Sequence, residues 1–122
     1  MKRKPMADCT VGELVDMYRQ SASAQHKAGD VGDNRTANRH SDILFGVYRE
    51  LRGRGQDALR GLLPLLRDED VGVRLWAASH TLEVAPEKAE PVLVEIQARP
   101  RTAGLSATYV LKQWREGTYK IP

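Results

Sequence analysis

Three histidines and one cysteine are the residues of this chain that could ligate a metal ion or carry acid–base chemistry: His26, His40, His80 and Cys9. They fall on separate predicted segments and lack the short spacings of a zinc site. The sequence also contains no nucleophile elbow and no phosphate-binding loop. We therefore expect no catalytic residue, no metal ion and no cofactor. We do not expect an enzyme, although residues distant in sequence could still converge on one site.

Two of the histidines fall among apolar residues. His40 lies on the apolar stripe of a predicted helix over residues 34–52, and His80 lies on a predicted helix over 71–85 that is apolar on nearly every side. One interpretation is that each ring is buried and hydrogen-bonded to a carbonyl or a carboxylate. The alternative is that His40 and His80 face each other across neighbouring helices and form a polar pocket.

Polar side chains accompany His40 on the same predicted helix. Asn38 and Asp42 are four residues apart and share a face with Arg35 and Arg49, and Arg39 could lie on it too. Together with His40 and His80, Arg35, Asn38 and Asp42 form our candidate surface for a partner or a ligand. The structural alternative is a solvated helix face with Asp–Arg pairs, each worth only a few tenths of a kcal/mol, or polar contacts to a neighbouring loop.

A candidate basic patch lies where the second and third predicted helices meet, at Arg49, Arg52, Arg54 and Arg60. Four arginines so close in sequence could hold phosphate groups. However, Glu50 and Asp57 lie among them, and no aromatic residue after Tyr48 is placed to stack on bases. We therefore expect an ordinary solvated corner, and nucleic-acid binding is an alternative function only.

The net charge of +3 comes from the beginning of the chain. Three of the nineteen lysines and arginines are at positions 2–4, so the other sixteen balance the sixteen aspartates and glutamates. No apolar run follows these basic residues as in a signal peptide, and none reaches the roughly eighteen residues of a membrane span. With one cysteine and no membrane segment, we expect a cytoplasmic protein.

The elements that must position these residues are all predicted to be helices. Thr10 and Glu13 have the spacing of a capping box, glycines follow the first two helices, and no segment alternates with period two. We expect a flexible basic leader over 1–8, one helical domain over 9–117 and a tail over 118–122. The predicted helices begin near Thr10 and then cover 34–52, 56–66 (bent at Pro64), 71–85, 86–98 and 102–114.

The segment from Leu62 to Leu82 resembles a HEAT repeat. Leu62-Leu63-Pro64-Leu65-Leu66 is followed by an acidic turn at 68–70, by Val73-Arg74 and by Ala77-Ala78. Residues 91–93 and 105–111 repeat this pattern more weakly. The resemblance implies an all-α fold of three stacked antiparallel helical pairs, a HEAT-like short α-solenoid, because one pair cannot bury its own apolar face.

The chain is also similar to a small bacterial family known only as a domain of unknown function. The similarity covers roughly residues 9–122 and implies the HEAT-like fold, but it brings no catalytic residues. It rests on the run from Val73 to Ala89, on Asn38 and Asp42, and on the closing pairs Ser106-Ala107, Leu111-Lys112 and Trp114-Arg115 with Gly117.

A concave surface of stacked helical pairs favours a protein–protein interaction module. An antidote that masks a toxin domain is one specific form, by analogy with other small HEAT-like proteins. The alternatives are weak nucleic-acid binding through the basic patch and a small-ligand pocket near the second helix. We expect the partner to be another protein, and the chain itself to be a monomer or a weak homodimer.

Overall fold

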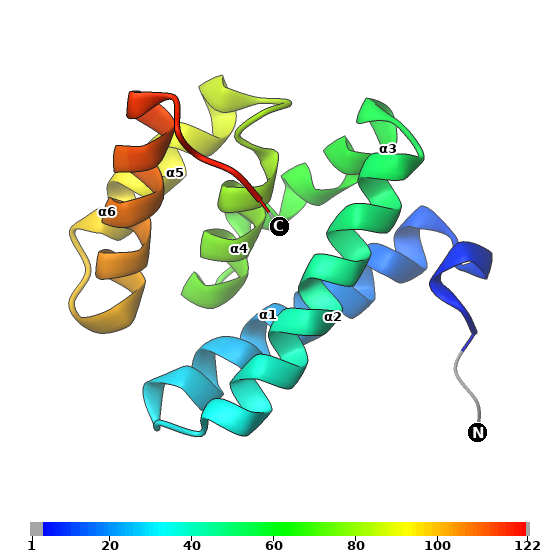
Figure 1. Ribbon diagram of the computed structural model, residues 1–122, viewed down its shortest axis with the longest axis horizontal. Coiled ribbons are helices and arrows are strands. Elements are labelled where there is room, and N and C mark those ends of the chain that lie inside the picture. The colour runs from blue at the N-terminus through cyan, green and yellow to red at the C-terminus, as the bar shows by residue number, and fades with distance from the viewer. Residues whose placement is uncertain (1–3, 122) are drawn as a thin grey trace.

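The computed structural model describes residues 4–121, which form helices and no strand (Figure 1). The prediction of an all-α fold is therefore confirmed over this part of the chain. In chain order, the elements are a 3₁₀ turn Met6–Asp8, α1 Val11–Asp30, α2 Asn34–Gly53, α3 Gln56–Leu59, a 3₁₀ helix Arg60–Arg67, α4 Val71–Thr81, α5 Pro86–Gln97 and α6 Arg101–Glu116.

The two longest helices, α1 and α2, form an antiparallel hairpin (Figure 1). The predicted capping box is present: Thr10 Oγ1 accepts from the amide of Glu13 at 3.1 Å, and Glu13 Oε1 accepts from the amide of Thr10 at 2.9 Å. Gly32 takes a φ of +77° in the turn between the helices, a conformation that costs glycine little. Asp33 then caps α2 by accepting from the amide of Thr36.

The structure differs from the prediction at the third helix. Only Gln56–Leu59 is α-helical, and Arg60–Arg67 is a 3₁₀ helix instead of a bent continuation. The physical reason is Pro64, which has no N–H to bond the carbonyl of Arg60 and whose ring crowds that carbonyl in an α-helix. The fourth helix also ends earlier than predicted, at Thr81, because Ala85 precedes Pro86 and takes an extended φ of −151°.

The fourth helix, α4, lies at the centre of the molecule and packs against α1, the 3₁₀ helix 60–67, α5 and α6 (Figure 1). Val73, Ala77 and Ala78 on α4 are fully buried, as expected for a helix that is apolar on most sides. The helices α5 and α6 pack on each other beside it. The tail after α6 then crosses α4, where the hydroxyl of Tyr119 donates to the carbonyl of Ser79 at 2.8 Å.

The acidic turn before α4 connects it to α1. Asp70 accepts from the amides of Gly72 and Val73 and so caps α4, while Ser23 on α1 donates to the other oxygen of Asp70 at 2.6 Å. Arg19, also on α1, donates to Asp68 at 2.6 Å. The same carboxylates therefore begin one helix and hold another against it.

The beginning of the described chain contacts α2. Arg54 donates to the carbonyl of Met6 at 2.9 Å, and Lys4 pairs with Glu13 at 3.0 Å. Lys2 and Arg3, on which the prediction of a flexible leader rests, lie outside the described residues. No helix in the described part of the chain is both long and apolar enough to cross a membrane.

A glycine permits the close approach of α1 and α4. A Cβ atom built on Gly72 would lie 2.3 Å from Cβ of His26 and 2.8 Å from its Cγ, far inside van der Waals contact. Neither His26 atom is the mobile end of a side chain, so relief requires the two helices to move apart.

We predict that Gly72→Ala destabilises the protein by about 1–3 kcal/mol, because the added methyl group overpacks the contact between the helices. The matched control is Gly29→Ala on α1, where nothing lies within 4 Å of the added atom. That variant is expected to gain about 0.5–1 kcal/mol, since alanine restricts the unfolded chain. Urea unfolding of both variants measures the difference, and equal stabilities would contradict the packing argument.

Candidate functional site

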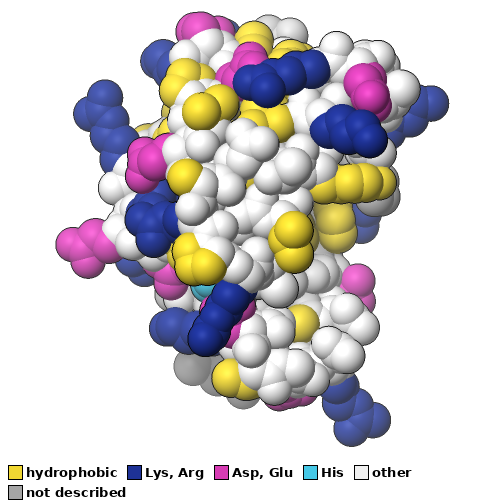
Figure 2. Space-filling model, turned by 90° about the vertical axis from the view of Figure 1, so that its left-hand side faces the viewer, with side chains coloured by type: hydrophobic (Ala, Val, Ile, Leu, Met, Phe, Trp, Pro, Cys, Tyr) yellow, Lys and Arg dark blue, Asp and Glu magenta, His cyan; other side chains and the backbone are white. Residues whose placement is uncertain are grey.

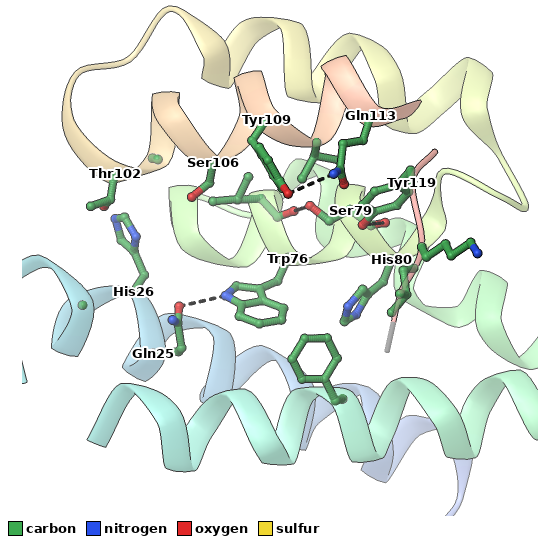
Figure 3. Close-up of a pocket in the computed structure, with 17 residues that line it drawn as sticks. Gln25, His26, Trp76, Ser79, His80, Thr102, Ser106, Tyr109, Gln113 and Tyr119 are labelled. Atoms are coloured by element: carbon green, nitrogen blue, oxygen red, sulfur yellow. Dashed lines mark hydrogen bonds between the residues drawn. The ribbon is translucent and has the colours of Figure 1, made fainter. Parts of the chain in front are cut away.

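A cavity of about 460 Å³ opens between α1, α2, α4, α6 and the tail (Figure 3). Four aromatic side chains line it: Phe45 from α2, Trp76 from α4, Tyr109 from α6 and Tyr119 from the tail. Cavities of this size that are lined by aromatic rings and a few polar groups are typical of small-ligand sites and of anchor pockets for a partner's side chain.

The inner end of the cavity is a cluster of rings around His80. Its ring centroid lies 4.5 Å from that of Tyr48, 5.5 Å from Trp76, 5.6 Å from Phe45 and 5.8 Å from Tyr18. Tyr18 comes from α1, and Phe45 and Tyr48 come from α2, so the cluster joins the α1–α2 hairpin to α4. Only 2% of His80 is exposed.

Burial keeps His80 uncharged, because desolvation lowers the pKa of its imidazole to about 3. Its Nδ1 lies 2.8 Å from the hydroxyl of Tyr18. Tyr18 is itself fully buried, and His80 is the only hydrogen-bond partner that its hydroxyl has among the described residues. We infer that the hydroxyl donates to Nδ1, since its proton would otherwise be buried without an acceptor, and this assigns the proton of the neutral imidazole to Nε2.

Hydrogen bonds fix two polar groups at the mouth of the cavity (Figure 3). The indole N–H of Trp76 donates to Oε1 of Gln25 at 2.9 Å, which orients the tryptophan between α1 and α4. On α6, the amide of Gln113 donates to the hydroxyl of Tyr109 at 2.9 Å. The amide protons of Gln25 and the carbonyl of Gln113 keep hydrogen-bonding capacity for a guest.

Of the five residues of the predicted partner or ligand surface, His80 alone lines this cavity. His40 is half-buried on α2 and contacts the hydroxyl of Ser21, with Nδ1 and Oγ 3.3 Å apart. Arg35, Asn38 and Asp42 are exposed on α2. Within the described chain, no hydrogen bond or ring contact joins His40 to His80.

The partners of the two buried or half-buried histidines differ from the expected ones. We expected a carbonyl or a carboxylate for each ring, and both rings instead contact hydroxyl groups. The physical reason is that the helices have already used their own carbonyls in backbone hydrogen bonds, whereas serine and tyrosine hydroxyls of α1 face the rings.

The four arginines of the predicted basic patch lie at the α2–α3 corner, where contacts within the chain hold Arg52, Arg54 and Arg60. Arg52 lies 3.8 Å from Glu83, Arg54 pairs with Glu50 at 2.8 Å, and Arg60 donates to the carbonyl of Val84 at 2.9 Å. Arg49 is exposed on α2. The contacts of Arg52 and Arg60 tie α2 and the 3₁₀ helix to the turn after α4.

Most of the cavity is not predicted by the sequence, including Gln25, Phe45, Trp76 and Tyr109. Trp76 lies on the predicted helix that is apolar on nearly every side, yet it is only half-buried and lines the cavity. One available signal was the pair Leu105 and Tyr109, two large apolar residues four apart that remain exposed on α6. In the described part of the chain, no cluster of three or more His, Cys, Asp or Glu side chains could hold a metal ion.

Residues 12–112 match a family described as "Domain of unknown function (DUF2019)". The chain belongs to the DUF2019 family. The match covers α1 to α5 and most of α6, and therefore includes Gln25, Trp76, His80 and Tyr109. Among curated proteins, none matches the chain closely enough to count as a relative.

A solved structure with the same arrangement is the protein RPA1889 from Rhodopseudomonas palustris CGA009, determined by crystallography. Its sequence is 27% identical, the TM-score is 0.89, and the alignment covers 98% of this chain and 100% of that one. This DUF2019 chain therefore shares its fold with a second protein over 98% of its length.

We predict that His80 makes stability depend on pH below neutrality. In the unfolded chain, histidine has a pKa of about 6.5, whereas burial lowers the pKa of His80 to about 3. Between these values the unfolded chain binds more protons, so stability is lost as the pH falls. The slope approaches about 1.4 kcal/mol per pH unit only well below pH 6.5, so about 2 kcal/mol is lost between pH 6.5 and pH 4.5.

The reference protein is the double variant Tyr18→Phe/His80→Phe, in which both members of the hydrogen bond become apolar. Glu13, Asp33 and Asp70 have lowered pKa values, so they also make the protein less stable in acid. Both proteins contain these three residues. Urea unfolding of the wild-type protein and of the double variant at pH 7 and pH 4.5 measures how much free energy of unfolding each loses. Equal losses in the wild-type protein and the double variant would show that His80 is not the source.

Proposed function

We propose that the chain is a non-catalytic module that binds another protein through α6 and the mouth of the cavity. The observation that carries the proposal is the exposure of two neighbouring apolar side chains: Leu105 is 73% exposed and Tyr109 is 62% exposed. They are four residues apart and therefore share one face of α6. Tyr109 also lines the cavity.

The surroundings of this pair support a protein interface. Thr102, at the beginning of α6, donates to Asp30 at 3.0 Å, which brings the α1–α2 turn and the 80%-exposed Val31 to the same end of the molecule. On this side, separate hydrophobic spots lie among charged side chains (Figure 2). Apolar anchors beside a pocket, surrounded by polar groups, are typical of interface centres.

The charge of the same segment indicates the chemistry of the partner. Residues 101–121 contain four lysines or arginines and one glutamate. One of the four, Arg115, pairs with Glu90. The complementary partner segment carries an apolar side chain flanked by carboxylates, since opposite charges steer association and fix orientation.

The proposal includes a HEAT-like arrangement of three helical pairs: α1 with α2, the 3₁₀ helix 60–67 with α4, and α5 with α6. Contacts between consecutive elements support it. Folds of this kind hold other proteins on a concave surface, and an antidote that masks a toxin domain is one form by analogy. Nucleic-acid binding has weaker support, because Arg52, Arg54 and Arg60 have partners within the chain.

The test uses a photocrosslinking residue, p-benzoylphenylalanine, placed at Leu105 in the protein expressed in its native host. We expect one crosslinked protein in near-stoichiometric yield, and a yield that falls with added salt in extracts because carboxylates contribute to docking. The matched control places the same residue at Val94, an apolar side chain on α5 that is 46% exposed and does not line the cavity.

The outcomes are distinguishable. A single partner crosslinked from position 105 and not from position 94 supports the proposal. The same diffuse set of products from both positions, or no product from either, contradicts it. Crosslinks to nucleic acid from position 105 would favour the alternative function.

A further inference from the structure

The polar group at the closed end of the cavity is a hydrogen-bond donor without a protein partner. Tyr18 occupies Nδ1 of His80, and no described residue bonds to Nε2. Every side-chain nitrogen or oxygen that is fully sealed from solvent in the described residues has a partner. Nε2 is therefore not fully sealed, and we place it toward the cavity because His80 is one of the residues that line it.

This donor is held rigidly. His80 is 2% exposed, and rings from α1, α2 and α4 surround it. The hydroxyl of Tyr18 fixes both the tautomer and the ring orientation. A buried N–H of this kind binds a carbonyl or carboxylate oxygen of a guest, and it cannot accept a proton from an ammonium group.

The charge at the same end favours a carboxylate. Lys120 lines the cavity, and its neighbour Tyr119 bonds the carbonyl of Ser79, the residue before His80. Lys120 therefore belongs to the part of the tail that lies beside His80. Among the described residues that line the cavity there is no aspartate or glutamate.

The remaining walls fit a flat apolar body. Trp76 and Tyr109 face the cavity from α4 and α6, and Figure 3 shows them on opposite sides of it. Stacked or edge-to-face contacts with aromatic rings stabilise a bound ring beyond simple burial. The volume of about 460 Å³ accommodates a molecule with one ring and a short side chain.

We propose that this cavity is a binding site for a small aromatic carboxylic acid, whose carboxylate accepts the Nε2 proton of His80 beside Lys120 and whose ring lies between Trp76 and Tyr109. This inference goes beyond the protein partner and does not depend on it, because crosslinking from Leu105 requires no ligand in the cavity.

The test titrates the full chain with three probes that share one body: 3-phenylpropionate, 3-phenylpropionamide and 3-phenylpropylamine. Binding is followed by the NMR signals of the indole N–H of Trp76 and of the His80 ring. The acid should bind most tightly, and the amide several-fold more weakly. The dissociation constant of the amine should be at least about tenfold higher than that of the acid. If the amine binds as tightly as the acid, or if the acid gives no saturable shift up to about 10 mM, the proposal is wrong.

Two substitutions locate the binding. Ser106→Trp fills the cavity from an exposed position on α6 and should abolish binding of the acid while the protein remains folded. The matched control is Thr108→Trp, an exposed position on the same helix that does not line the cavity, and it should bind normally. If both variants bind the acid as the wild-type protein does, the acid binds elsewhere and the assignment fails.

Two further measurements test the chemistry of recognition. Lys120→Gln should weaken binding of the acid several-fold and leave binding of the amide unchanged, because only the acid is charged. Long-range ¹H–¹⁵N correlations should show the His80 proton on Nε2, and its signal should move when the acid binds. A proton on Nδ1, or an equal effect of Lys120→Gln on both probes, would overturn the proposed contacts.

Discussion

The hydrogen bond between Tyr18 and His80 is the interaction on which the rest of the structure depends. It joins α1 to α4 across 62 residues of sequence, and it is buried among the rings of Tyr48, Phe45 and Trp76. Because the Tyr18 hydroxyl and Nδ1 of His80 are buried together, each requires the other, and burial keeps the imidazole neutral. The same bond leaves Nε2 directed at the cavity, so the constraint that stabilises the core also sets the chemistry of the site.

The helix α4 packs closely against α1 on one side and borders the cavity on the other. Gly72 and the capped acidic turn hold α1 tightly against α4. The helix α6 packs on α4 and α5 and buries the small residues Ala103, Gly104 and Ala107, while Thr102 bonds Asp30 of α1. The aromatic side chains of the cavity lie where α6 and α1 diverge, and the tail closes one end of the space between them.

Charge distribution assigns different roles to the two ends of the domain. At the α2–α3 corner, arginines are engaged with Glu50, Glu83 and the carbonyl of Val84, so they contribute to the contacts between helices. At the α6 end, apolar side chains are exposed beside the cavity and basic residues outnumber acidic ones. Both proposed binding events therefore belong to the α6 end, one on its surface and one within it.

The sequence by itself determined the local elements: the capping box at Thr10, the helical character of the described chain and the burial of His80. These follow from residue spacing within one or two helical turns, which a sequence displays directly. Only the tertiary structure decided which hydroxyl meets His80, which arginines are paired and where a cavity opens. Those outcomes depend on residues such as Gln25 and Trp76, 51 positions apart, whose meeting is set by how whole helices pack.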